Sequence, residues 1–274
     1  MAFFLTQSTS PEYDGPISDR KLWRYNASAC ALHAGQGLLM LVASQAVPAI
    51  KAFKKELTTS FLVFDHRTKA LVSETKSVGS VELGLAAAAF LLISALAHGW
   101  VLAFFGAYMR DIDRQINRAR WYEYALSSSV MICAIAMLFG CYDVGALVLM
   151  FCVNASMNFF GLLMEKLNPK ERRATDWSPF VFGCVAGAAP WAVVLLYFFG
   201  GGNYSQIPGF VYGILFGYFL FFNTFPINMA LQYARIGKWA DYRYGELCYI
   251  VLSLLSKSLL AWLVFGGTFQ PNGN

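Results

Sequence analysis

One lysine of this chain lies inside an apolar stretch, where its amine could do chemistry. Lys257 is near the middle of residues 247–265, a segment with no other charged side chain. A charged amine at such a depth in a membrane costs roughly 2.5–3.5 kcal/mol, so it marks a functional site by default. A lysine amine also forms Schiff bases with carbonyl compounds, including aldehyde cofactors. The sequence therefore predicts a reactive amine that needs an acidic partner.

Glu123 is the acid best placed to meet this lysine. If its helix begins near Asp113 or Arg114, Glu123 lies roughly 14 Å deep at 1.5 Å per residue. Lys257 follows Glu246 by eleven residues, which places it roughly 16 Å deep by the same rise. Both helices start from the same side of the membrane, so we expect the two groups to neutralise each other. The alternative is a lone glutamate that snorkels to the end of its helix.

Polar side chains close to this pair extend the candidate site. Ser253 precedes the lysine by four residues, shares its helix face, and can donate a hydrogen bond to a counterion. Arg120 precedes the glutamate by three residues, from where it could help to keep the acid ionised. His33 and His98 are expected at the same level of the membrane, which suggests a polar and hydrated pocket. A hydrogen bond to a neighbouring helix explains each histidine equally well.

Composition places these residues in a membrane protein. Of 274 residues, 57% are hydrophobic and 14% are charged, whereas a soluble domain carries about 25% charged residues. A spanning helix needs about 20 apolar residues, and seven runs qualify: residues 23–47, 81–108, 121–141, 144–164, 180–199, 210–233 and 247–265. We predict an all-α membrane protein, with one seven-helix bundle over residues 1–274. Glu165 and Glu246 fall near helix ends, where we expect them to reach water.

The distribution of Lys and Arg predicts the orientation of this bundle. Fourteen of the 21 basic residues fall on the side of the N-terminus, and six fall on the other side, all within residues 51–80. The positive-inside rule therefore predicts a multi-pass protein of the cell membrane with a cytoplasmic N-terminus and an extracellular C-terminus. The net charge of +5 follows from this bias and does not indicate a nucleic-acid partner. The first ten residues lack the pattern of a removable signal peptide.

Several runs of the sequence resemble one known family. They are residues 120–131 (RWYEYALSSSVM), 153–157 (VNASM), 208–213 (PGFVYG) and 249–258 (YIVLSLLSKS). Together with Gly237-Lys238-Trp239 they make the chain similar to heliorhodopsins, which belong to the microbial-type rhodopsins. The first two helices match mainly through His33 and His98. The predicted orientation is the feature that distinguishes this family from other rhodopsins.

The resemblance implies a retinal protein. Lys257 would hold all-trans retinal as a protonated Schiff base, with Glu123 as the counterion and Ser253 where many relatives have a second acid. His33 and His98 would belong to a polar cavity on the cytoplasmic side. The other cofactor-binding residues that we predict are Arg120, Tyr124, Ser127, Ser128, Asn154, Trp191, Phe222 and Trp262.

The resemblance also implies a function for the long loop. It implies that this loop, residues 51–80, forms an extracellular β-hairpin that helps to hold a homodimer. Residues 60–64 and 70–73, separated by residues 65–69, have the composition of two strands and a turn. A solvated loop without strands is the alternative.

We interpret the chain as a photoreceptor that does not pump ions and is not an enzyme. On the outer side of Lys257 no Asp, Glu or His is expected within the membrane, so a released proton would pass to Glu123 or to the histidines. The resemblance implies light sensing through an unidentified downstream partner. One alternative is a light-gated or light-driven proton or ion transporter. Another is a transporter or channel in which Lys257 and Glu123 form a gating ion pair.

Overall fold

A computed structural model describes residues 15–172, 174–200 and 209–269 of the protein. Three features used in the sequence analysis lie outside these ranges: the first ten residues, Pro208 of the run at residues 208–213, and Arg173, one of the fourteen basic residues counted on the side of the N-terminus. Within them, seven helices are long and apolar enough to cross a membrane, which confirms the predicted fold class. They are α1 (Asp19–Ala46), α3 (Leu83–Ala103), α5 (Arg118–Leu138), α6 (Val144–Leu167), α7 (Ser178–Gly200), α8 (Gly209–Tyr233) and α9 (Tyr242–Gly267).

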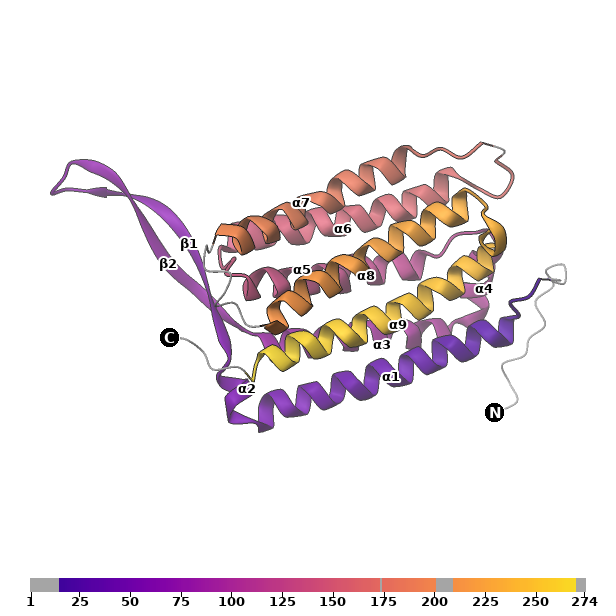
Figure 1. The fold of residues 1–274 in the computed structure, drawn as a ribbon, viewed down its shortest axis with the longest axis horizontal. Coiled ribbons are helices and arrows are strands. Elements are labelled where there is room, and N and C mark those ends of the chain that lie inside the picture. Colours follow the sequence, from indigo (N-terminus) through magenta and orange to yellow (C-terminus); the bar gives the residue numbers. More distant parts are fainter. Residues whose placement is uncertain (1–14, 173, 201–208, 270–274) are drawn as a thin grey trace.

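The helices run side by side in one bundle (Figure 1). The central helix α3 contacts α1, α5 and α9, while α6 packs between α5 and α7. Two short helices, α2 (Pro48–Ala52) and α4 (Phe105–Asp113), and the 3₁₀ helix η2 (Gly237–Ala240) complete the helical part of the described chain. The start of α1 and the end of α9 lie at opposite ends of the bundle (Figure 1).

Capping residues explain where α5 and α9 begin, the helices that carry Glu123 and Lys257. Asn117 precedes α5, and its side chain accepts a hydrogen bond from the Arg120 N–H. Asp241 precedes α9 and accepts from the Arg243 N–H in the same way. Because these side chains satisfy donors that have no partner within the helix, they fix its first residue. Helix α5 therefore starts later than the position near residue 113 that we assumed from the sequence.

The second predicted run, residues 81–108, is not one helix. Its first two residues belong to a strand, and the helix α3 ends at Ala103. Phe104 interrupts the helical backbone with φ −114° and ψ 39°, after which α4 begins. The chain thus bends near the end of the bundle where α1 starts.

A two-stranded antiparallel hairpin, β1 (Lys54–Asp65) and β2 (Ala70–Glu82), extends beyond the other end of the bundle (Figure 1). This confirms the predicted hairpin, with strands longer than the runs recognised in the sequence. At the turn, the Asp65 carboxylate accepts hydrogen bonds from the Arg67 N–H and the Thr68 hydroxyl, both at 2.8 Å. At the base, the Thr58 N–H donates to the Tyr142 carbonyl at 2.9 Å, which ties the hairpin to the α5–α6 connection.

Two helices carry an internal proline. Pro190 lies within α7 and Pro226 lies within α8. Proline has no N–H to donate to the carbonyl four residues earlier, so each helix lacks one backbone hydrogen bond near its middle. Both helices line the large cavity described below.

Candidate functional site

Lys257 and Glu123 form a buried ion pair. The Lys257 Nζ lies 2.5 Å from the Glu123 Oε1, and the two residues are 5% and 9% exposed. Ser94 of α3 joins them: its hydroxyl accepts a hydrogen bond from Nζ at 2.8 Å and donates one to Glu123 Oε1 at 2.7 Å. Three helices, α3, α5 and α9, thus converge on one amine.

The pair is formed for a reason that differs from our depth argument. Glu123 is five residues past the first residue of α5, and Lys257 is fifteen past the first residue of α9. These separations correspond to roughly 8 Å and 22 Å along the two helix axes. The estimate of roughly 14 Å for Glu123 was too large because α5 begins at Arg118, whereas the roughly 16 Å for Lys257 was counted from Glu246, four residues after the first residue of α9. The groups meet because the two helices begin at different levels of the bundle.

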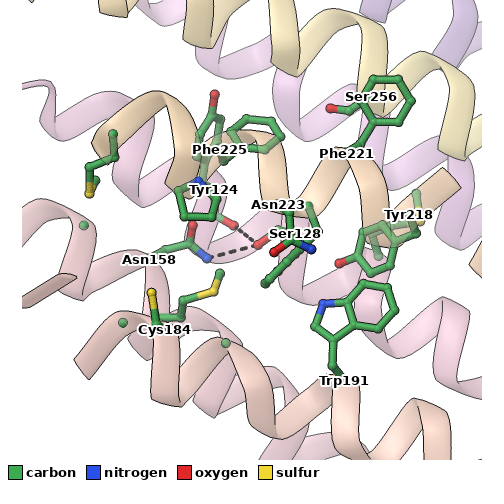
Figure 2. A pocket seen from close by; sticks show the side chains of 18 of the residues that line it. Tyr124, Ser128, Asn158, Cys184, Trp191, Tyr218, Phe221, Asn223, Phe225 and Ser256 are labelled. Carbon is green, nitrogen blue, oxygen red and sulfur yellow. Dashed lines mark hydrogen bonds between the residues drawn. The ribbon is translucent and has the colours of Figure 1, made fainter. Parts of the chain in front are cut away.

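A large apolar cavity of about 490 Å³ begins at Lys257. Aromatic side chains of α7 and α8 dominate its wall, with Trp191 stacked on Tyr218 at 5.0 Å between ring centroids. Figure 2 shows these two rings on one side of the cavity, and Tyr124 with Phe225 further along. Cavities of 300–1,000 Å³ with mostly apolar walls and few polar groups are typical of small-molecule sites. This cavity can hold a long apolar molecule whose end reaches the lysine amine.

Five of the thirteen predicted cofactor-binding residues line this cavity. Those that line it are Lys257, Tyr124, Ser128, Trp191 and Phe222. Asn154 lies behind the wall, where it donates to the hydroxyls of Ser128 and Ser129 at 2.7 and 3.0 Å. Ser127 is buried on α5, one helical turn beyond Glu123.

Trp262 is not brought to the described cavity wall. It is 42% exposed on the outside of α9, and its indole N–H donates to Gln36 at 2.9 Å. Five residues separate it from Lys257, which rotates its side chain by about 140° around the helix. It therefore faces away from the lysine.

The two predicted histidines lie next to each other. His33 is fully buried and stacks on His98, with 5.8 Å between ring centroids. His98 Nδ1 shares a hydrogen bond of 2.8 Å with the Asn26 side-chain oxygen, which agrees with the interpretation that the residue bonds a neighbouring helix. Both ring nitrogens of His33 are buried and lack a partner among the described residues.

Arg120 has different partners from the one we expected. Its guanidinium forms ion pairs with Glu165 of α6 and Glu246 of α9. The side chain leaves α5 toward these acids, so it does not serve Glu123 as the i,i+3 spacing suggested. It also lies over the Tyr249 ring, with 4.0 Å from the guanidinium carbon to the ring centroid.

Glu165 and Glu246 are buried, which corrects the expectation that they reach water. Each is 2% exposed. Glu165 accepts hydrogen bonds from the Tyr242 hydroxyl, the Trp121 indole and the backbone N–H of Asn117. These donors replace water around the carboxylate. We refer to Arg120, Glu165 and Glu246 as the arginine cluster.

A second, small cavity of about 30 Å³ borders both Glu123 and this cluster. Among the residues of its wall are Glu123, Ser253, His98, Arg120 and Glu246. The Ser253 hydroxyl and the Arg120 Nε are buried and have no hydrogen-bond partner among the described residues. Polar atoms therefore make up a larger share of this wall than of the wall of the large cavity.

Comparisons with known proteins agree with this architecture. The family model described as Heliorhodopsin matches residues 22–269. The chain belongs to the heliorhodopsin family. A comparison with curated proteins gave no match.

Solved rhodopsins share the fold of this heliorhodopsin. Exiguobacterium sibiricum rhodopsin is similar with a TM-score of 0.61 and 13% identity, over 90% of this chain and 95% of that one. Cyanorhodopsin from the cyanobacterium Tolypothrix sp. NIES-4075 gives 0.56 and 11%, over 90% and 99%. Thermophilic rhodopsin gives 0.56 and 11%, over 90% and 93%. At such low identity these structures support the fold alone.

The family and fold make the chain a photoreceptor-type protein with a retinal chromophore, and the residues present fit that group. The large cavity has an aromatic wall that suits a polyene, and it reaches Lys257, the one buried lysine among the described residues. Gly187 widens it: a Cβ atom there would lie 2.7 Å from Met157 Sδ and 3.3 Å from Phe222 Cζ.

Sequence reasoning missed Ser94 and the arginine cluster. Ser94 precedes His98 by four residues, so the shared helix face was a signal that could have identified it. The two acids of the cluster were recognised as charges, but their pairing with Arg120 depends on how three helices face one another. No spacing within a single helix carries that information.

Proposed function

We propose that this heliorhodopsin is a light sensor in which Lys257 carries all-trans retinal as a protonated Schiff base. Glu123 serves as the counterion. The observation that supports this proposal is the 2.5 Å contact between Lys257 Nζ and Glu123 Oε1 at the wall of the large cavity. Retinal, when bound, supplies absorption of visible light and a change of shape on excitation.

The roles of the chain's own residues follow from their contacts. Glu123 stabilises a positive charge on the Lys257 nitrogen, because a buried charge needs a close opposite charge in a low dielectric. Ser94 fixes the distance between them through its two hydrogen bonds. The aromatic wall orients the apolar ligand and keeps bulk water from the nitrogen.

We further propose that the protein signals and does not pump. In the described helices, the segments between Lys257 and the hairpin end contain no Asp, Glu or His. A proton that leaves the lysine nitrogen thus has acceptors only toward the end where α1 begins, and by the charge distribution that end faces the cytoplasm. Motion of α7 and α8 around the cavity would pass the signal to an unidentified partner.

The hairpin supports a homodimer as part of this proposal. Its distal half exposes large apolar side chains on both faces: Phe61, Leu62, Phe64, Leu71 and Val72. Such a surface is a typical protein contact site, because contiguous exposed apolar patches are uncommon on soluble surfaces. A second copy of the chain is the partner that the family resemblance implies.

Reconstitution with all-trans retinal tests the proposal. The purified protein should become coloured, whereas Lys257→Ala and Lys257→Arg should stay colourless. Lys238→Ala, which changes an exposed lysine of η2, is the matched control and should colour normally. A coloured Lys257→Ala protein, or a colourless wild type, would refute the chromophore site. A steady photocurrent in expressing cells would refute the absence of pumping.

A further inference from the structure

The arginine cluster carries more acid than base. Arg120 supplies one positive charge and the two glutamates supply two negative charges, and all three side chains are no more than 4% exposed. Arginine stays protonated in proteins, so the cluster has a net charge of −1 unless one acid holds a proton. By contrast, the Lys257–Glu123 pair is balanced.

We propose that Glu246 accepts the proton that leaves the Lys257 nitrogen after illumination, through water in the small cavity. This inference rests on the proposed function. The N–H bond at Lys257 breaks, and Glu123, which contacts the nitrogen and lines the small cavity, relays a proton to the water there. The water passes a proton on, and an O–H bond forms on Glu246 Oε2. The net charge of the arginine cluster then changes from −1 to zero, while Glu123 keeps its charge.

Hydrogen bonding favours Glu246 over Glu165 as the acceptor. Each oxygen of Glu165 accepts two hydrogen bonds. Oε1 accepts from Arg120 and the Tyr242 hydroxyl. Oε2 accepts from the Trp121 indole and the Asn117 backbone N–H. Glu246 Oε1 also receives two donors. Its Oε2, however, has Arg120 as its one donor among the described residues. Since a carboxylate oxygen has two lone pairs, Oε2 can bind a proton without displacing a neighbour.

Position also favours Glu246. It lines the small cavity together with Glu123, whereas Glu165 is not among the described residues of that wall. The volume of about 30 Å³ has room for about two water molecules. The buried Ser253 hydroxyl and Arg120 Nε, which lack other partners in the described chain, provide the polar contacts that such water needs.

Other titratable groups that face Glu246 can be assigned different roles. The Tyr108 hydroxyl donates to Glu246 Oε1 at 3.1 Å, and the Asn117 amide donates to the same oxygen at 2.7 Å. Tyr108 therefore holds the carboxylate in place. His98, on the same cavity wall, already shares its Nδ1 with Asn26.

Infrared difference spectroscopy on the reconstituted protein tests this assignment. Light should produce a carboxylic acid C=O band as the visible band is lost. Glu246→Gln should still colour but lose that C=O band completely, while the matched variant Glu165→Gln should keep it. A band that persists in Glu246→Gln, or a coloured wild type without any such band, would overturn the assignment. A colourless wild type would instead refute the proposed function.

Two further measurements make the result independent of folding and of the cofactor. Glu246→Asp retains an acid, so its band should return at a shifted frequency; an unshifted band would overturn the proposal. In the protein without retinal, the infrared difference between acidic and neutral pH should contain one carboxylic acid component that Glu246→Gln removes and Glu165→Gln retains. The reverse pattern would assign the surplus charge to Glu165 and contradict the proposal.

Discussion

The two buried charge clusters of this heliorhodopsin use different cations. At the cavity, a lysine meets one acid and one serine; in the arginine cluster, a guanidinium meets two acids from two other helices. A lysine amine can lose its proton when buried, whereas arginine keeps its charge. The cation of the first cluster can therefore exchange a proton, whereas the cation of the second stays charged and holds α5, α6 and α9 together, so that proton uptake there falls to an acid. Predictions follow from this difference, in order of decreasing effect.

The largest effect is expected from Arg120→Met. It leaves two buried carboxylates without a countercharge, which should lower the free energy of unfolding by roughly 3–5 kcal/mol. The measurement is denaturation of the coloured protein, followed through its visible band. Arg118→Met is the control, because Arg118 is 56% exposed beside Asp111 and such surface pairs contribute about 0–1 kcal/mol. Equal losses in the two variants would show that the buried arginine cluster stabilises the bundle no more than a surface ion pair does.

Glu123→Gln should change the spectrum more than the fold. The charge on the chromophore nitrogen loses its stabilising partner in the ground state, so the absorption maximum should move to longer wavelength. Acidification of the wild type should produce the same shift as Glu123 takes up a proton, and it should have no such effect on the variant. A spectrum that titrates identically in both proteins would exclude Glu123 as the counterion.

Ser94→Ala should have a smaller effect on thermal stability and on the absorption spectrum. It removes the hydroxyl that bonds both Lys257 and Glu123, and a typical hydrogen bond contributes about 1 kcal/mol. We expect a modest loss of thermal stability and a spectral shift smaller than that of Glu123→Gln. Ser44→Ala is the matched control, because Ser44 is equally buried but has no hydrogen-bond partner among the described residues. A larger loss in Ser44→Ala would contradict the role of Ser94.

The smallest effect is expected at an ion pair outside the membrane. Lys54 and Glu82 are 2.8 Å apart at the base of the hairpin. The hydrogen bond from Lys54 lowers the pKa of Glu82, with help from Gln45. A lowered pKa in the folded state stabilises the protein above the unfolded pKa of about 4.3, and this contribution is lost as the pH falls through the folded pKa.

Glu82→Gln should therefore have a slightly lower thermal midpoint than the wild type at pH 7. The difference should disappear in acid, below the lowered pKa. Thermal scans of both proteins across this range provide the measurement. A difference that grows on acidification would show that Glu82 acts through another contact.

The fold was predictable because it depends on local composition. Seven long apolar runs have few alternatives to transmembrane helices, and the runs at residues 60–64 and 70–73 indicated the strands. The Lys257–Glu123 pair was also predictable, since a membrane offers a buried lysine few other partners. The levels at which the helices begin could not be predicted, because they depend on capping residues such as Asn117.

Contacts between helices limit what the sequence can show about the site. Arg120 shares a face of α5 with Glu123, yet its long side chain reaches acids on two other helices. Trp262 is close to Lys257 in sequence but points outward. In each case the direction of a side chain around its helix decides the outcome, and that direction is set by packing across the whole bundle.

The helices that line the large cavity differ in stiffness because only some of them contain an internal proline. Helices α5 and α9, which hold the ion pair, have no internal proline, whereas α7 and α8 each have one at Pro190 and Pro226. Bending at these points costs less than bending an unbroken helix. A ligand that changes length inside the cavity would thus leave the Lys257–Glu123 pair in place on α5 and α9. It would instead tilt α7 and α8 on the opposite wall.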